Sequence, residues 1–499
     1  MFYNDNNILA AKTGYERYGE TMARDKMTRR EMAAFAAGDI FGGGGQSVLS
    51  VLYLIFLTNV LRIEPALAGL SILISKVWDA VIDPLLGVIT DNTRTRMGRR
   101  RPYILAGGIL LIPSMALLWL PVNFSSQTAR VLFATASYLI YNTVASIIAV
   151  PYSSMSTEVT EDFDECNKVN ILRLVFSLAS TALCTLLPSL LFEDSIKRNL
   201  PFTGTYFTLV LGFGTLFAVP VILTALKSRE RVPYEDKRST VSFKALIKPF
   251  HVRAFRELMQ LYLAQAVTLD MVAAVVMYYS LYVVRGMTST VFLGMFFGVQ
   301  LLMFPLFNRL VGRVSKTKIY RFGLPLAIAG SLCIAIYPAG WPAWGIYGIT
   351  VLTALGFAGA QAMSWIIFPD VVDITEMGLK ERITGSLSGV MAFVRTISTA
   401  VATFLIGNML SLTGFVLPTD DVPLPAQPQT AILGIRLIMF LPFALLMGYA
   451  WFKAKDFGLT PQISQRIKYF NDRLHHGGLD GLSGTEKAEY EALKKEFVS

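Results

Sequence analysis

The stretch Lys76-Val77-Trp78-Asp79-Ala80-Val81-Ile82-Asp83-Pro84 lies inside an apolar run, residues 66–90, that is long enough to cross a membrane. Asp79 and Asp83 are four residues apart, so they lie on one face of a helix. Each charge placed in hydrocarbon costs about 2.5–3.5 kcal/mol on insertion scales. Two carboxylates and a lysine in one span therefore indicate a binding site, and carboxylates this close can hold a monovalent cation or share one proton.

Further apolar runs of similar length lie on both sides of this stretch. Together, twelve runs cover residues 32–60, 66–90, 103–122, 127–155, 169–193, 205–226, 257–284, 289–312, 319–338, 342–368, 384–415 and 429–453. The chain is 53% hydrophobic and only 16% charged, whereas soluble domains are about 25% charged. The sequence therefore predicts an all-α integral membrane protein with twelve transmembrane helices in two six-helix bundles.

The polar stretches divide the chain into five parts. They are an N-terminal segment (1–31), a first bundle (32–226), a basic linker (227–256), a second bundle (257–453) and a tail (454–499). Lys and Arg crowd alternate loops, most densely from Arg94 to Arg101, and this bias places both chain ends in the cytoplasm. We expect a multi-pass protein of the inner or plasma membrane.

The tail has the pattern of two short helices. Thr460-Pro461 is a helix start, an amphipathic stretch follows it, and a second polar helix is predicted at about 485–498. We expect both helices to be solvated or to lie on a surface.

Composition also argues against several other classes of protein. The net charge of +10 is spread over many loops rather than gathered in one patch, so we expect no nucleic-acid partner. Three scattered cysteines have neither disulfide-framework nor metal-ligand spacing, and the only histidines are His251, His475 and His476, in polar segments. We therefore expect no enzyme, no bound metal and no cofactor other than a coupling ion.

Two consecutive motifs identify a family resemblance. Trp78-Asp79-x-x-x-Asp83-Pro84-x-x-Gly87 is followed by Asp91-Asn92-Thr93-Arg94-Thr95-Arg96-x-Gly98-Arg99-Arg100-Arg101-Pro102. This pattern resembles the glycoside–pentoside–hexuronide cation symporters, the melibiose-permease relatives within the major facilitator superfamily. The resemblance implies a monomer whose two bundles rock around a midplane cavity, so that cation binding favours the state that binds the solute.

The resemblance implies that Asp79 and Asp83 bind the coupling cation. Ser146 falls where a relative uses a threonine hydroxyl to complete this site, although a serine that only packs between helices is the equal alternative. Ile82 replaces an asparagine of the melibiose permease and offers no oxygen to sodium, which favours a proton or a sodium site completed differently. The alternative for the whole cluster is that Lys76 neutralises Asp79 and the charges only pack helices.

Arg173 and Arg395 match basic residues of the family and are expected to bind the solute, because a guanidinium donates to hydroxyls or to a carboxylate. Two cationic groups would favour an anionic solute such as a uronide. The alternative for each is an ion pair with an acid inside the membrane. Further cavity-lining candidates, each weighed against simple packing, are Tyr141, Asn142, Gln361 and Trp365.

The solute side also departs from the melibiose permease. Ala149 and Ser153 replace its acidic and aromatic residues, and the first helix reads Gly42-Gly43-Gly44-Gly45, which allows close approach of a ligand or simply of another helix. Melibiose itself is therefore not the expected solute.

Two further charge clusters stand out. Asp91 with Arg99 and Arg100 resembles the superfamily signature between helices two and three, and is expected to lock the outward state through ion pairs. Asp270 stands where relatives have a neutral polar residue. It is expected to pair with Arg395, to carry an extra proton, or only to line a wet cavity.

The sequence thus predicts a symporter that moves a glycoside, uronide or related small solute with a proton or sodium ion. Two rivals stay open. One is a cation symporter of lysolipids or other amphiphiles, and the other is an uncoupled uniporter or sensor with the same fold.

Overall fold

The computed structural model describes residues 26–156, 158–160, 163–198, 200–231, 248–284, 286–310, 313–379, 384–419, 422–476 and 483–498. Most of the N-terminal segment and of the linker, with Lys380 and Arg382, lies outside the described residues. Within them, eleven helical segments are long and apolar enough to cross a membrane. A twelfth, α4 (Pro65–Asn92), has the length but carries Lys76, Asp79 and Asp83 in its middle. The all-α membrane fold is confirmed.

The first half of the chain forms one group of helices. They are α2 (Arg29–Ala37), α3 (Asp39–Ile55), η1 (Phe56–Val60), α4, α5 (Arg101–Leu118), α6 (Gln127–Met155), α7 (Phe163–Lys197), α8 (Thr203–Phe207), η2 (Thr208–Phe213) and α9 (Gly214–Lys227).

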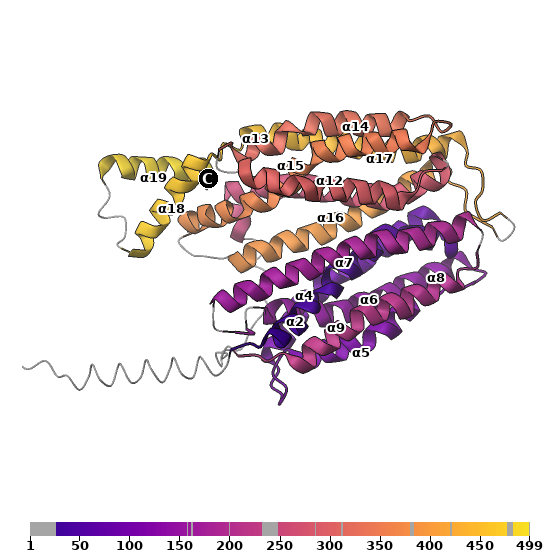
Figure 1. The fold of residues 1–499 in the computed structure, drawn as a ribbon, viewed down its shortest axis with the longest axis horizontal. Coiled ribbons are helices and arrows are strands. Elements are labelled where there is room, and N and C mark those ends of the chain that lie inside the picture. Colours follow the sequence, from indigo (N-terminus) through magenta and orange to yellow (C-terminus); the bar gives the residue numbers. More distant parts are fainter. Residues whose placement is uncertain are drawn as a thin grey trace, which may run out of the picture.

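The second half forms another group. It consists of η3 (Lys248–His251), α11 (Arg253–Tyr278), η4 (Tyr279–Val283), α12 (Ser289–Leu310), α13 (Lys316–Phe322), α14 (Leu324–Ile336), α15 (Ala343–Leu379), α16 (Thr384–Leu412) and α17 (Gln429–Asp456), followed by the tail helices α18 (Pro461–His476) and α19 (Gly484–Phe497). Figure 1 shows the two groups side by side with their long helices roughly parallel. The halves meet where α4 packs on α16, α7 on α12 and α3 on α11.

Two predicted helices are broken at glycines. The run 32–60 divides into α2, α3 and η1, with Gly38 between the first two, and the run 319–338 divides into α13 and α14 at Gly323. A Cβ on Gly38 would lie 2.7 Å from Thr224 Oγ1, and one on Gly323 would lie 2.2 Å from the Gly356 carbonyl oxygen. Each break therefore lies where another helix approaches the backbone.

The two halves are joined tightly at one end, which we call the closed end. The Thr58 and Tyr278 hydroxyls lie 2.7 Å apart, and Asn59 Nδ2 donates to the Tyr282 hydroxyl at 2.7 Å. Between described residues, the hydrogen bonds that join the halves all lie at this end. The helices α2 and α18 lie at the opposite end, which we call the tail end (Figure 1).

At the closed end, α4 and α16 approach backbone to backbone. A Cβ on Gly69 would lie 2.9 Å from Phe404 Cα, and one on Gly407 would lie 2.2 Å from the Pro65 carbonyl oxygen. Small residues permit this approach between membrane helices. The helix that carries the paired carboxylates is thus in direct contact with the second half.

The first tail helix begins where the sequence predicted and packs on the protein. Helix α18 begins at Pro461, and the Ile463 amide donates to Thr460 Oγ1, as the helix-start pattern predicts. The sequence did not say which surface would cover the apolar face of α18, and the structure shows that it is the protein itself, because Ile467 and Phe470 are 1% and 0% exposed. Asn471 Nδ2 donates to the Asp373 carbonyl at 2.8 Å, which fixes α18 to the end of α15.

Candidate transport site

The centre of the site is an ion pair on α4. Lys76 Nζ lies 3.0 Å from Asp79 Oδ2, one turn along the helix, and the residues are 6% and 9% exposed. The ammonium also donates to Gln46 Oε1 at 3.4 Å and lies 5.6 Å from the centre of the Tyr138 ring. A lysine this buried is held in place by its counter-charge and by the aromatic face. The charge of Asp79 is therefore matched by Lys76.

Asp83 has a different environment although it lies one turn from Asp79. Both carboxylates line a cavity of about 200 Å³, together with residues of α3, α6 and α16. The Asp83 residue is exposed to that space, and the Ser146 hydroxyl of α6 lies within its reach. Among the ion pairs of the described residues, none involves Asp83.

Helix α6 supplies the polar wall behind these charges. Tyr141 and Asn142 both line the cavity, as the sequence predicted, and Asn142 Nδ2 donates to the Ser75 carbonyl at 2.9 Å. Trp78 Nε1 donates to Thr143 Oγ1 at 2.9 Å. These bonds tie α4 to α6 on both sides of Lys76 and fix the direction in which Asp79 and Asp83 point.

The four consecutive glycines of α3 have two separate roles. A Cβ on Gly43 would lie 2.3 Å from the Ser177 carbonyl and one on Gly44 2.3 Å from Ser180 Oγ, so these two allow α7 to pack closely. Gly42 instead lines the cavity together with Gln46, one turn further along. Close helix packing, one of the two interpretations that the sequence allowed, therefore applies at Gly43 and Gly44, whereas close approach of a ligand at Gly42 stays a prediction.

Arg173 does not line this cavity. Its Nε lies 3.1 Å from Asp39 Oδ2 and donates to the Tyr152 hydroxyl at 3.2 Å, and its guanidinium carbon lies 4.6 Å from the centre of the Tyr152 ring. This geometry is the alternative allowed by the sequence, an ion pair with an acid inside the membrane. A role of Arg173 in solute binding stays a prediction.

Arg395 lies on α16 next to Thr396, which lines the cavity. Its NH2 group lies 3.3 Å from Asp270 Oδ1, and Thr399 Oγ1 donates to Asp270 Oδ2 at 2.6 Å. The Arg395 side chain is 39% exposed, and charged groups within membrane spans are expected to face the interior of the helix bundle or a cavity rather than hydrocarbon. The 3.3 Å contact shows that Asp270 pairs with Arg395, which was one of the alternatives that the sequence allowed.

The other second-half candidates lie around this pair rather than in the cavity of α4. Gln361 accepts a hydrogen bond from Gln265 Nε2 of α11. Trp365 is 52% exposed and meets the Tyr262 ring edge to face at 5.5 Å between centroids. Tyr262 links Trp365 to Arg395, because its ring packs on Trp365 and its hydroxyl interacts with the guanidinium, and an exposed aromatic ring is a surface suited to sugar rings.

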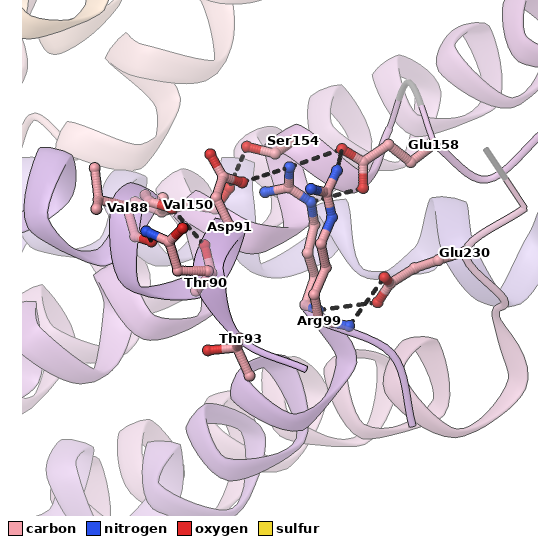
Figure 2. A network of polar contacts seen from close by, with 12 residues as sticks. Val88, Thr90, Asp91, Thr93, Arg99, Val150, Ser154, Glu158 and Glu230 are labelled. Carbon is pink, nitrogen blue, oxygen red and sulfur yellow. Dashed lines mark hydrogen bonds and ion pairs between the residues drawn. The ribbon is translucent and has the colours of Figure 1, made fainter. Parts of the chain in front are cut away.

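A second charge cluster of the first half is shown in Figure 2. It lies near α2 at the tail end, because the Arg231 amide donates to the Glu158 carbonyl and the Arg231 side chain pairs with Glu31 of α2. Arg100 donates to Glu158 through Nε and NH2, both at 2.7 Å, and its NH2 lies 2.9 Å from Asp91 Oδ1. Arg99 NH2 also donates to Glu158, at 2.6 Å. The predicted trio of Asp91, Arg99 and Arg100 is thus brought together, and its action as a lock stays a prediction.

Sequence reasoning missed two acids of this cluster. Glu158 accepts from both arginines, and Glu230 accepts from the backbone amides of Arg99, Arg100 and Arg101 at 3.0, 2.9 and 3.3 Å (Figure 2). Glu230 thereby caps the start of α5, where a carboxylate also complements the helix dipole. The available signal was that both acids follow predicted membrane spans, at the same end as the arginine-rich loop. Their distance along the sequence did not show which arginine each acid would contact.

We expect Glu158→Gln to destabilise the first half by about 3 kcal/mol, because it leaves two partly buried guanidinium groups without their shared carboxylate. Thermal unfolding of the purified protein in detergent should show a melting temperature several degrees below that of the wild type. Glu489→Gln is the matched control, since Glu489 also pairs with an arginine but both side chains are about 40% exposed. Equal melting of Glu158→Gln and this control would mean that the cluster does not stabilise the fold.

One further missed residue lies at the closed end. Glu193 is 2% exposed and accepts from the Ser289 amide at 2.8 Å, from the Ser289 hydroxyl, and from Lys197 Nζ at 2.7 Å. Ser289 begins α12, so a carboxylate of the first half caps a helix of the second. Glu193 ends an apolar run, and an acid at that position was a signal that the sequence offered.

Comparison with known proteins extends over nearly the whole fold. Residues 34–453 match the family model described as MFS/sugar transport protein. A putative glycoside/cation symporter of Escherichia coli is 23% identical over 89% of this chain and 96% of its own length. A putative sulfoquinovose importer of Salmonella typhimurium is 28% identical over 83% of this chain and 86% of its own length.

Solved structures agree in fold. The nucleoside transporter NupG aligns with a TM-score of 0.54 at 12% identity, covering 86% of this chain and 96% of its own. A proton dependent oligopeptide transporter aligns with a TM-score of 0.58 at 10% identity, covering 88% of this chain and 99% of its own. At these identities the likeness concerns the arrangement of helices alone.

Proposed function

This chain belongs to the MFS/sugar transport protein family, as a cation symporter of the glycoside–pentoside–hexuronide type, and on that premise we propose that it couples one monovalent cation at Asp83 to one small polar solute. It is a multi-pass membrane transporter and not an enzyme. The proposed solute is a glycoside, a uronide or a related compound. The proposed cycle is alternating access, in which the closed end opens as the tail end shuts.

The observation that carries this proposal is the unequal pairing of the two carboxylates. Asp79 is bound to Lys76 at 3.0 Å, whereas Asp83 faces the same cavity without an ion pair among the described residues. An uncompensated carboxylate in a membrane interior is costly, so this state favours taking up a cation. We therefore assign coupling to Asp83 and a supporting role to the Lys76–Asp79 pair.

A proton is our preferred coupling ion. Sodium is a hard cation that needs several oxygen ligands, whereas a proton needs only one carboxylate. Near Asp83 the cavity offers the Ser146 hydroxyl, and the Ile82 side chain contributes no oxygen. The other oxygen-bearing side chains of this cavity are Gln46, Asp79, Tyr141, Asn142 and Thr396, and a sodium site would have to draw its remaining ligands from these, from the solute or from water.

We also propose that the tail end faces the cytoplasm of a cell whose inner or plasma membrane holds the protein as a monomer. The arginine-rich loop and both α2 and α18 lie at that end, and basic loops remain on the cytoplasmic side. In this orientation the closed end faces outward.

The test is uptake by proteoliposomes under imposed gradients. The purified protein would be screened with labelled glycosides, uronides and lysolipids under a proton gradient, a sodium gradient and none. Accumulation of a glycoside or uronide driven by one gradient supports the proposal and names the ion. Accumulation of lysolipids only, or solute entry that ignores both gradients, would instead establish the amphiphile carrier or the uniporter.

A further inference from the structure

The charges around the proposed transport path pair almost completely. Lys76 pairs with Asp79, Arg173 with Asp39, and Arg395 with Asp270. Among these groups only Asp83 is left over, so they sum to one negative charge. The sequence favoured an anionic solute because it counted two cationic groups, but each of them has its own acid.

Asp270 is held beside Arg395 by contacts from α16 to both of its carboxylate oxygens. Its Oδ1 lies 3.3 Å from the Arg395 NH2 group, and its Oδ2 accepts from Thr399 Oγ1 at 2.6 Å, so both oxygens are used. Its side chain is 13% exposed, against 39% for that of Arg395. The acid is thus the more buried member of the pair, and the guanidinium is the more accessible one.

We propose that Asp270 determines charge selectivity, and that the solute is an uncharged glycoside. One monovalent cation on Asp83 brings the sum of charges in this region to zero, and a neutral solute leaves it there. A uronide would add a negative charge beside Asp270, and each of the three cationic groups Lys76, Arg173 and Arg395 is already neutralised by its own acid. This inference rests on the proposed function and narrows its solute class.

The arrangement still leaves Arg395 a role in binding. A guanidinium has five N–H donors, and Asp270 and the Tyr262 hydroxyl engage only part of them, so further donors can reach hydroxyl groups. The exposed Trp365 face, held edge to face by Tyr262, provides an apolar surface for a sugar ring. Hydroxyls and one ring face are the features of a neutral glycoside.

The experiment compares matched pairs of probes that differ only in charge, such as methyl β-glucoside with methyl β-glucuronide and their galacto counterparts. Binding to the purified protein is measured by calorimetry, and uptake in proteoliposomes, for the wild type and Asp270→Asn. Thr399→Val is the matched control, because it removes a hydrogen bond to Asp270 without changing charge.

We expect the wild type to prefer the neutral member of a pair, and Asp270→Asn to shift the ratio of affinities towards the glucuronide by about tenfold or more, as removal of one like charge near a ligand does. Thr399→Val should keep the wild-type preference. Uptake of the neutral probe should carry one positive charge inward per solute molecule, seen as a current on a supported membrane.

Three results overturn the inference: a wild type that prefers glucuronides, an Asp270→Asn variant with an unchanged ratio, or binding of no member of any pair. Selective binding without gradient-driven uptake would overturn the proposed function and leave the charge selectivity standing. The melting temperature of Asp270→Asn separates a changed preference from a misfolded protein.

Discussion

Asp83→Asn should abolish accumulation of solute against a gradient while leaving exchange of solute between the two sides. Asparagine has the shape of a protonated aspartate but cannot release a proton and carries no negative charge to hold a cation, so the carrier keeps its solute site and loses the coupling step. We expect accumulation to fall at least about 100-fold, the loss that removal of a single essential proton carrier produces. Uptake and counterflow in the same proteoliposomes measure the two activities.

Ser146→Ala is the matched control for this variant. It keeps the carboxylate and removes only the neighbouring hydroxyl, so we expect at most about a tenfold weaker response to the driving ion, the value of one hydrogen bond. If Asp83→Asn accumulates solute as the wild type does, the carboxylate is structural and the coupling assignment is wrong. If exchange is lost as well, Asp83 also holds the solute site together.

Glu193→Gln should open the closed end. The Glu193 carboxylate of α7 joins Lys197, the Ser289 amide and the Ser289 hydroxyl at the start of α12, and all of these partners except Lys197 lie across the interface between the halves. Loss of a hydrogen bond to a charged group costs about 1.5–3 kcal/mol. Because this loss destabilises the closed state alone, the equilibrium should shift towards the open state by about tenfold or more.

The opening can be measured without knowing the solute. With the native cysteines replaced by serine, Ala68→Cys places one thiol at a fully buried position beside the Gly69 contact. Labelling by a membrane-impermeant maleimide should be about tenfold faster or more in Glu193→Gln than in the parent. Asp194→Asn is the control, since Asp194 pairs with Arg198 on the exposed surface and its loss should change nothing. Equal labelling rates in the parent, Glu193→Gln and Asp194→Asn would contradict the prediction that Glu193 stabilises the closed end.

The membrane spans were predictable because their signal is local. Some twenty apolar residues are needed to cross hydrocarbon, and each predicted run corresponds to helix in the structure. The breaks at Gly38 and Gly323 were not predictable, because they depend on a backbone from another helix that approaches the glycine. The packing of α18 on α15 was missed for a similar reason, since an amphipathic pattern does not say what covers its apolar face.

The clustering of Lys76, Asp79 and Asp83 was also predictable, because these residues lie within three turns of one helix. The partners of the arginines were not. Arg173 pairs with Asp39, at a separation of 134 residues in the sequence, and Arg395 pairs with Asp270, at a separation of 125 residues. To predict such a pair, one must know that both residues lie at the same depth in the membrane. An apolar run defines its ends only to within several residues, so the sequence showed the cationic groups but not the acids that pair with them.

The placement of Lys76, Asp79 and Asp83 on α4 has a consequence for biosynthesis. Three ionised groups would add several kcal/mol to the transfer of an isolated α4 from the translocation machinery into lipid. Of its two main neighbours, α16 is synthesised about three hundred residues later, whereas α6 follows soon after and supplies the bonds from Asn142 and Thr143 that hold α4. The free-energy cost of inserting α4 is therefore lower if α4 stays at the insertion machinery until α6 emerges, so that the two helices enter the bilayer together.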